Sequence, residues 1–274
     1  MRYFVAPTSI VRRIWGSADM VLFIFAGAAA EFALNKAVDW LYFTGRLPTD
    51  PLGRLFSTVD YARSIVFADC SEAEEAIARI AAIHAAVETK RGQAIPAWAS
   101  RDVLFMLIGY SIRAFELLER QLTPPECEEI TAVFCRVGRR LGIPDLPPSY
   151  PAWQLARAQH LAADLTASPL TADLFRQYRK HLGGPRYWLL RRVQGLLVPP
   201  DMRQLLGLRR ERWLRPVLAL YLSTRHLAVS QWAKRLMLPA DYQARISALD
   251  EVPAAGLPAR QAVCPFPHAQ LRAR

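Results

Sequence analysis

The residues whose types could do chemistry gather between positions 50 and 90. His84 lies on the apolar side of an aliphatic segment, and the residues around it are small: Ala81, Ala82, Ala85 and Ala86. A flat, bulky group could approach the imidazole there without meeting large side chains. Because a neutral imidazole is a common metal ligand, His84 is a candidate ligand. A hydrogen-bonded core histidine is the alternative that the sequence leaves open.

A polar group precedes this histidine along the chain. Arg54 and Thr58 are one helical turn apart and share a face of any helix that contains them, and Ser57 lies beside them. The sequence thus places hydrogen-bond donors on one segment and a candidate metal ligand on the next. An ion pair from Arg54 to Asp50 or Asp60 is the competing interpretation for the guanidinium.

Helix-capping signals indicate how these residues are positioned. Asp50, with proline at the next position, is typical of a helix start and predicts a helix over residues 50–68. Ser71 and Glu74 have the spacing of a capping box, which predicts a second helix over residues 71–90. Two consecutive helices would then carry the polar group and the histidine.

Prolines and glycines punctuate helical periods along the rest of the chain, with almost no alternating β-type runs, so we expect an all-α protein. One compact multi-helix domain is expected over residues 1–250. The Pro- and Ala-rich segment 251–274 has too little periodic apolar content to pack, so it is predicted to be a disordered tail.

The richest apolar run, residues 20–30, is shorter than the roughly 20 residues that a bilayer crossing needs. We therefore expect a buried core helix there. No secretory signal is visible in the first residues, and the default expectation is a cytoplasmic location.

The net charge of +11 is concentrated in the C-terminal half, where basic and aromatic residues are interleaved. They are Arg191, Arg192, Arg209, Arg210, Arg212, Arg215, Lys234, Arg235, Trp188, Trp213, Tyr221 and Trp232. Such a surface suits an anionic membrane, so peripheral membrane contact is expected. Nucleic acid is not expected as a partner, because no nucleic-acid-binding module appears. Helices that simply keep arginine on the solvent side are the alternative.

Other polar residues give weaker signals. His160, His181 and His226 lie on separate predicted helices and are expected at surface or capping positions. Tyr110 is interpreted as a core tyrosine with a satisfied hydroxyl.

Six segments, in order along the chain, resemble the bacterial family of mpaB-type oxygenases and rubber oxygenases, the latter known as latex-clearing protein. The resemblance extends from about residue 9 to about residue 249. The segments are Ile14–Asp19 (IWGSAD), Asp50–Thr58 (DPLGRLFST), Ile65–Asp69 (IVFAD), Ala82–Ala85 (AIHA), Arg113–Glu116 (RAFE) and Val137–Pro144 (VGRRLGIP).

In the rubber oxygenases a histidine on a helix is the proximal ligand of a b-type haem, and the preceding helix supplies an Arg-x-x-Lys-Thr set on the distal side. The resemblance implies that His84 binds the iron of haem b. It also implies that Arg54, Ser57 and Thr58 line the distal side of a central cofactor pocket. For Tyr110 the resemblance implies the alternative to a core tyrosine, a polar residue near this central pocket.

Three positions depart from the family pattern. Ser57 replaces the distal lysine, and Ala81 stands where relatives have an arginine three residues before the histidine. Many relatives carry Ala-His-Pro after the first apolar segment, where this chain reads AGAAA at residues 26–30. Without the lysine, we expect an iron that small ligands can reach.

Oxidative cleavage of an alkene also calls for a base. Asp39 is the nearest acidic candidate, and an ion pair with Lys36 or a solvent-facing charge is its alternative. The first hypothesis is thus a haem-b-dependent oxygenase acting on an apolar, isoprenoid or lipid-like substrate. The second is a non-catalytic helical protein that binds a lipid or membrane surface and has lost the cofactor chemistry.

Overall fold

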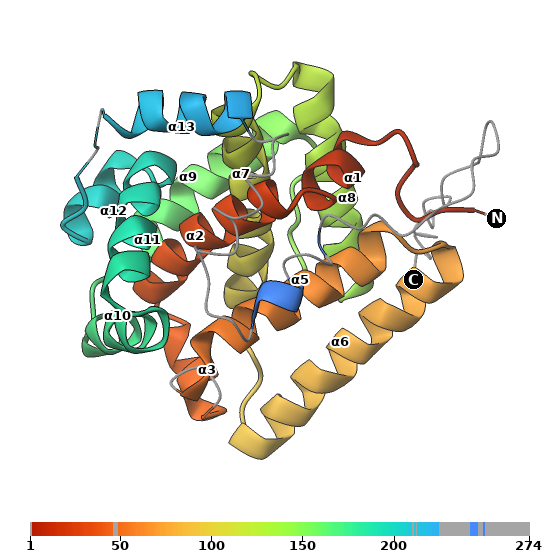
Figure 1. Cartoon of the computed structure of the whole chain (residues 1–274). Helices are drawn as coiled ribbons and strands as arrows, with labels where there is room; N and C mark the ends of the chain where they lie inside the picture. Colours follow the sequence, from red (N-terminus) through yellow and green to blue (C-terminus); the bar gives the residue numbers. More distant parts are fainter. Residues whose placement is uncertain are drawn as a thin grey trace, which may run out of the picture.

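The protein is represented by a computed structural model, which describes residues 2–45, 49–209, 211, 213–224, 242–245 and 249. Within these residues the chain is helical and contains no β-strand, only isolated bridges, so the all-α prediction is confirmed (Figure 1). The predicted tail at 251–274 lies outside the described residues. The helices are α1 (Ile10–Trp15), α2 (Ala18–Leu34), α3 (Val38–Phe43), α5 (Pro51–Val66), α6 (Cys70–Arg91), α7 (Ala97–Leu118), α8 (Pro124–Arg140), α9 (Tyr150–Ala163), α10 (Pro169–Leu182), α11 (Gly184–Leu197), α12 (Pro200–Leu205) and α13 (Leu214–Thr224).

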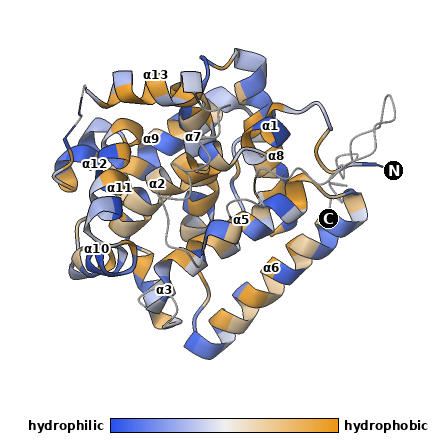
Figure 2. Cartoon of the chain, in the orientation of Figure 1, coloured by the Kyte–Doolittle hydropathy of each residue, from blue (hydrophilic) through white to orange (hydrophobic). Residues whose placement is uncertain are grey.

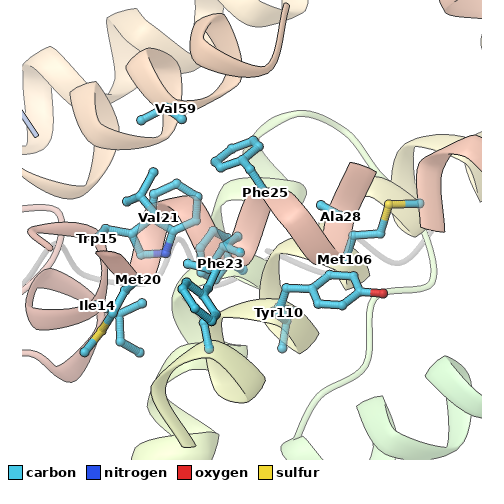
Figure 3. Packing of buried hydrophobic residues seen from close by; sticks show 14 of the residues in the cluster. Ile14, Trp15, Met20, Val21, Phe23, Phe25, Ala28, Val59, Met106 and Tyr110 are labelled. Carbon is cyan, nitrogen blue, oxygen red and sulfur yellow. The ribbon is translucent and has the colours of Figure 1, made fainter. Parts of the chain in front are cut away.

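Helix α2 is the centre of the fold. Every residue of it is buried except Leu22 and Phe32, because α7 and α11 pack along it and α1, α3 and α10 also contact it. The prediction of a buried core helix at residues 20–30 is therefore confirmed. Figure 3 shows part of this core, with Phe23 and Phe25 of α2 among the aromatic side chains.

Helices α2 and α7 approach closely at Gly27. A Cβ atom at this position would lie 2.2 Å from Cδ1 of Tyr110, whose side chain is buried in the core. Only a residue without a side chain leaves room for the ring there. The ring in turn carries the Tyr110 hydroxyl to the carboxylate of Glu31, to which it donates a hydrogen bond of 2.9 Å.

The helix starts follow local capping chemistry, with one correction. Asp50 accepts a hydrogen bond from the Gly53 N–H at 2.8 Å and caps α5, as predicted. Helix α6, however, begins at a capping box formed by Asp69 and Glu72, not by Ser71 and Glu74. Asp69 accepts the Glu72 N–H at 3.0 Å, so the helix starts earlier than predicted and contains the predicted capping pair.

The later helices agree closely with the sequence pattern. A capping box of Thr123 and Glu126 opens α8, and prolines occupy the first turns of α9, α10 and α11. None of the described helices combines the length and apolar content that a membrane crossing requires.

Candidate functional site

Helices α5 and α6 bring the predicted polar group and the predicted ligand together. A short turn joins the two helices, and they pack side by side (Figure 1). Arg54 of α5 is close enough to His84 of α6 for its positive charge to lower the pKa of the imidazole. Two of the residues chosen from sequence thus meet from separate helices.

His84 is partly buried and has no hydrogen-bonded neighbour in the part of the chain that the structure describes. Burial is the main cause that lowers its pKa, the charge of Arg54 lowers it further, and Glu88 partly offsets these effects. The imidazole is therefore held in its neutral form, which is the form that binds metals. These contacts do not support the alternative interpretation of His84 as a hydrogen-bonded core histidine.

The outer side of α6, next to His84 in sequence, is apolar and only loosely covered. The buried residues of α6 are Ala73, Ala76 and Ile77, all in its first half. Beyond them the four alanines near His84 are exposed, and Ile83 keeps 46% of its surface accessible. Hydrophobic residues run along this helix at the edge of the molecule (Figure 2). This uncovered apolar face could bind a flat apolar ligand. His84 lies on the other side of α6, which it shares with the buried Ile77 and the half-buried Ile80 and Val87.

The polar residues of α5 are bonded mainly to one another. Arg54 donates a hydrogen bond to Oγ1 of Thr58 at 3.1 Å, and the Ser57 hydroxyl donates to the Gly53 carbonyl at 2.9 Å. Among the described residues no ion pair joins Arg54 to Asp50 or Asp60; Asp60 pairs with Arg245, and Asp50 caps the helix. The Arg54–Thr58 pair thus presents a preorganised guanidinium beside His84.

Asp39 of α3 lies beside the C-terminal end of α6. Its carboxylate pairs with Arg91 of α6 at 2.7 Å, and the Arg91 guanidinium stacks 3.8 Å from the centre of the Trp40 ring. The ion pair with Lys36 that the sequence allowed is replaced by this one. Among the described residues Asp39 contacts neither His84 nor Arg54, so the structure does not bring the proposed base to them.

A second polar cluster, which sequence reasoning missed, is buried between α2, α7 and α9. Glu31 is fully buried, both its oxygens accept hydrogen bonds from Arg157, and Tyr110 and His160 also contact it. Burial alone would raise the pKa of Glu31, but Arg157 and His160 outweigh it and lower the pKa to about 2. Three helices are therefore joined by one buried carboxylate.

His160 links this carboxylate to two more. Its Nε2 lies 3.2 Å from Glu31, while its Nδ1 lies 2.7 Å from Asp102 and 3.2 Å from Asp164. Burial alone would lower the pKa of His160, but the hydrogen bonds to Asp102 and Glu31 raise it to about 9. The expected surface or capping position for His160 is therefore wrong.

The comparison with protein families decides between the classes that a helical protein of this kind could belong to. Residues 12–230 match the family model described as ER-bound oxygenase mpaB/B'/Rubber oxygenase, catalytic domain. The chain belongs to this family. No curated protein and no solved structure matches the chain.

Membership of the mpaB/rubber oxygenase family makes this chain an oxygenase catalytic domain and confirms the resemblance read from six short segments. The matched region contains α5, α6 and both polar clusters. Each residue chosen from sequence, as well as the buried cluster around His160, therefore lies within the catalytic domain.

Proposed function

We propose that the protein is a haem-b-dependent oxygenase in which His84 is the iron ligand, acting on an apolar substrate of the isoprenoid or lipid class. The observation that carries the proposal is the setting of His84. A partly buried, neutral imidazole without a hydrogen-bonded neighbour in the described residues lies on the inward side of α6, between the apolar Ile80 and Val87 and near Arg54.

The residues present fit a haem. The macrocycle is flat and apolar, and the neighbours of the imidazole on α6, which are Ile80, Val87 and the small Ala81 and Ala85, are apolar as well. A haem also carries two carboxylates, which a nearby guanidinium such as Arg54 can pair with. A bound haem would supply a redox-active iron for reactions of dioxygen, which is the chemistry an oxygenase needs.

The protein's own residues then have separate tasks. The hydrogen bond from Arg54 to Thr58 fixes the direction of the guanidinium, so its charge stays on the His84 side of α5. Ser57 is short and its hydroxyl is bonded to the helix backbone, so it leaves free the space that a lysine would fill. Asp39 pairs with Arg91 and contacts neither His84 nor Arg54 among the described residues, so it could act as a base only on a substrate that extends towards α3.

An isotope experiment tests the oxygenase proposal. Cleavage of one C=C bond by one O₂ molecule gives two carbonyl groups, so the reaction balances without a reductant. Haemin-loaded protein is incubated with squalene, an isoprenoid probe, under ¹⁸O₂. We expect carbonyl products labelled with ¹⁸O, and none from His84→Ala. Unlabelled products, or equal labelling from the variant, would contradict the proposal.

One surface observation favours a membrane partner as well. Trp188 and Trp213 stack with ring centres 6.0 Å apart and remain 47% and 45% exposed. Val217 and Leu220 of α13 are 51% and 66% exposed. Exposed aromatic and aliphatic side chains on a basic chain suit the surface of an anionic membrane. We propose that this face, the α11–α13 face, docks on a membrane from the cytoplasmic side and gives access to dissolved apolar substrates.

The non-catalytic alternative differs from the first proposal in one property. A protein that uses only the α11–α13 face would bind membranes and retain no haem. The two hypotheses therefore predict different haem contents, whatever the result of a membrane-binding assay.

A further inference from the structure

We propose that Asp102, His160 and Asp164 form a binding site for one divalent transition-metal ion, separate from His84. The three ligand atoms, a histidine nitrogen and two carboxylate oxygens, lie within 4.8 Å of one another. His160 and Asp164 are four residues apart, so α9 and its C-cap present both on one side. Asp102 reaches the same point from α7.

The surrounding hydrogen bonds orient the ligands so that one nitrogen or oxygen atom of each faces the same point. Nε2 of His160 contacts Glu31, so it is Nδ1 that faces the two aspartates. Oδ2 of Asp102 accepts a hydrogen bond of 3.1 Å from Asn35, so Oδ1 faces the histidine. A metal-bound histidine commonly donates its second N–H to a carboxylate, which orients the ring. Glu31 is positioned for that role.

The charge balance of the cluster also favours a cation. Glu31, Asp102 and Asp164 contribute three negative charges, and Arg157 contributes one positive charge. With His160 protonated, as in the ion pairs described above, one negative charge remains uncompensated in a largely buried place, which is costly. A divalent ion that displaces the proton from Nδ1 would bring the cluster to neutrality. Asp164 keeps 24% of its side chain exposed, and this side gives an ion its entry path and water its coordination positions.

The spacing requires a small adjustment. Ligand atoms around a tetrahedral zinc ion with bonds of about 2.1 Å are roughly 3.4 Å apart. Nδ1 lies 3.2 Å from Asp164 but 2.7 Å from Asp102, so Asp102 must move back by roughly 0.7 Å. One nitrogen and two oxygens suit Zn²⁺ or Mn²⁺ better than Mg²⁺ or Ca²⁺, which prefer oxygen ligands alone.

Metal titration of the full-length protein tests this site. The protein is stripped with EDTA, the chelator is removed, and Zn²⁺ or Mn²⁺ binding is measured by calorimetry. We expect one ion per chain, and Asp164→Asn should weaken binding tenfold or more because it removes a charged ligand. The matched control is Asp145→Asn, which makes the same change at an aspartate whose side chain is 83% exposed and lies outside the cluster.

The results expected for a metal site differ from those expected for an ion-pair network. No binding to the stripped wild type, or unchanged binding in Asp164→Asn, would overturn the proposal and leave the cluster as an ion-pair network. X-ray absorption of the Zn²⁺-loaded wild type gives a readout that needs no variant: one imidazole with oxygen ligands supports the site, and sulfur or several imidazoles would refute it. The proposal does not rest on haem, and we expect Asp164→Asn to retain the wild-type haem content.

Discussion

Replacing Glu31 by glutamine should destabilise the protein strongly, because it removes the charge that two buried cations share. The side chain of Glu31 is 0% exposed, and Arg157 and His160 both contact it. Its pKa falls from an ordinary 4.5 to about 2, which at about 1.4 kcal/mol per pH unit corresponds to about 3 kcal/mol. Removing one partner of a buried ion pair typically costs about 3–5 kcal/mol, which agrees with the free energy obtained from the pKa.

The measurement is urea unfolding at pH 7 in EDTA. We expect Glu31→Gln to lose about 3–5 kcal/mol in the free energy of unfolding, with an unchanged slope against urea. The sign of the pH dependence follows from the lowered pKa. The contribution of Glu31 is present above about pH 4.5 and is lost as the pH falls towards 2, where the folded carboxylate becomes protonated. The variant should lack this component of acid destabilisation.

Glu126 provides a matched control. Its pKa is also lowered to about 2, by hydrogen bonds from Arg120 and Thr123, yet it lies at the protein surface. Glu126→Gln keeps an acceptor for the capping box, so its loss should stay within the small range typical of surface ion pairs. If Glu31→Gln and Glu126→Gln cost the same, burial would not determine the effect, and our reasoning about the buried cluster would be refuted.

Three further predictions concern the core, the site and the surface. Gly27→Ala should cost about 3 kcal/mol in urea unfolding, since Tyr110 cannot move away from the new Cβ; a neutral change would show that α2 and α7 can separate. Arg54→Gln should raise the pKa of His84, followed by NMR titration of the haem-free protein, because a nearby positive charge is lost; no rise would mean that the two residues are not close. Leu220→Glu should reduce co-sedimentation with phosphatidylserine vesicles while Leu155→Glu, at a 70% exposed leucine of α9, should not; equal losses would contradict docking through α13.

Sequence patterns predicted the features that depend on neighbouring residues. The cap at Asp50 was found because capping is decided within one turn. The start of α6 was misassigned because two capping boxes overlap there, and local chemistry alone cannot choose between them. Asp69 is selected by contacts with the N-terminal segment, where it bridges to Tyr3 and the next N–H donates to the Arg2 carbonyl at 2.8 Å.

The buried cluster could not be predicted because its members are distant in sequence. Glu31 is 129 residues from His160, and only the three-helix packing brings them together. The one local signal was Asp164, four residues after His160, which marked a shared helix face. The partner of Asp39 was missed for the same reason, since Arg91 is 52 residues away.

The measurement that tests the central claim most directly is the absorption spectrum of the purified protein with a pyridine haemochrome assay. The account predicts about one haem b per chain and a Soret band, both lost in His84→Ala while circular dichroism is unchanged. His181→Ala, at a partly exposed histidine of α10, should keep both. A colourless wild type that cannot be reconstituted with haemin, or a haem that survives in His84→Ala, would contradict it.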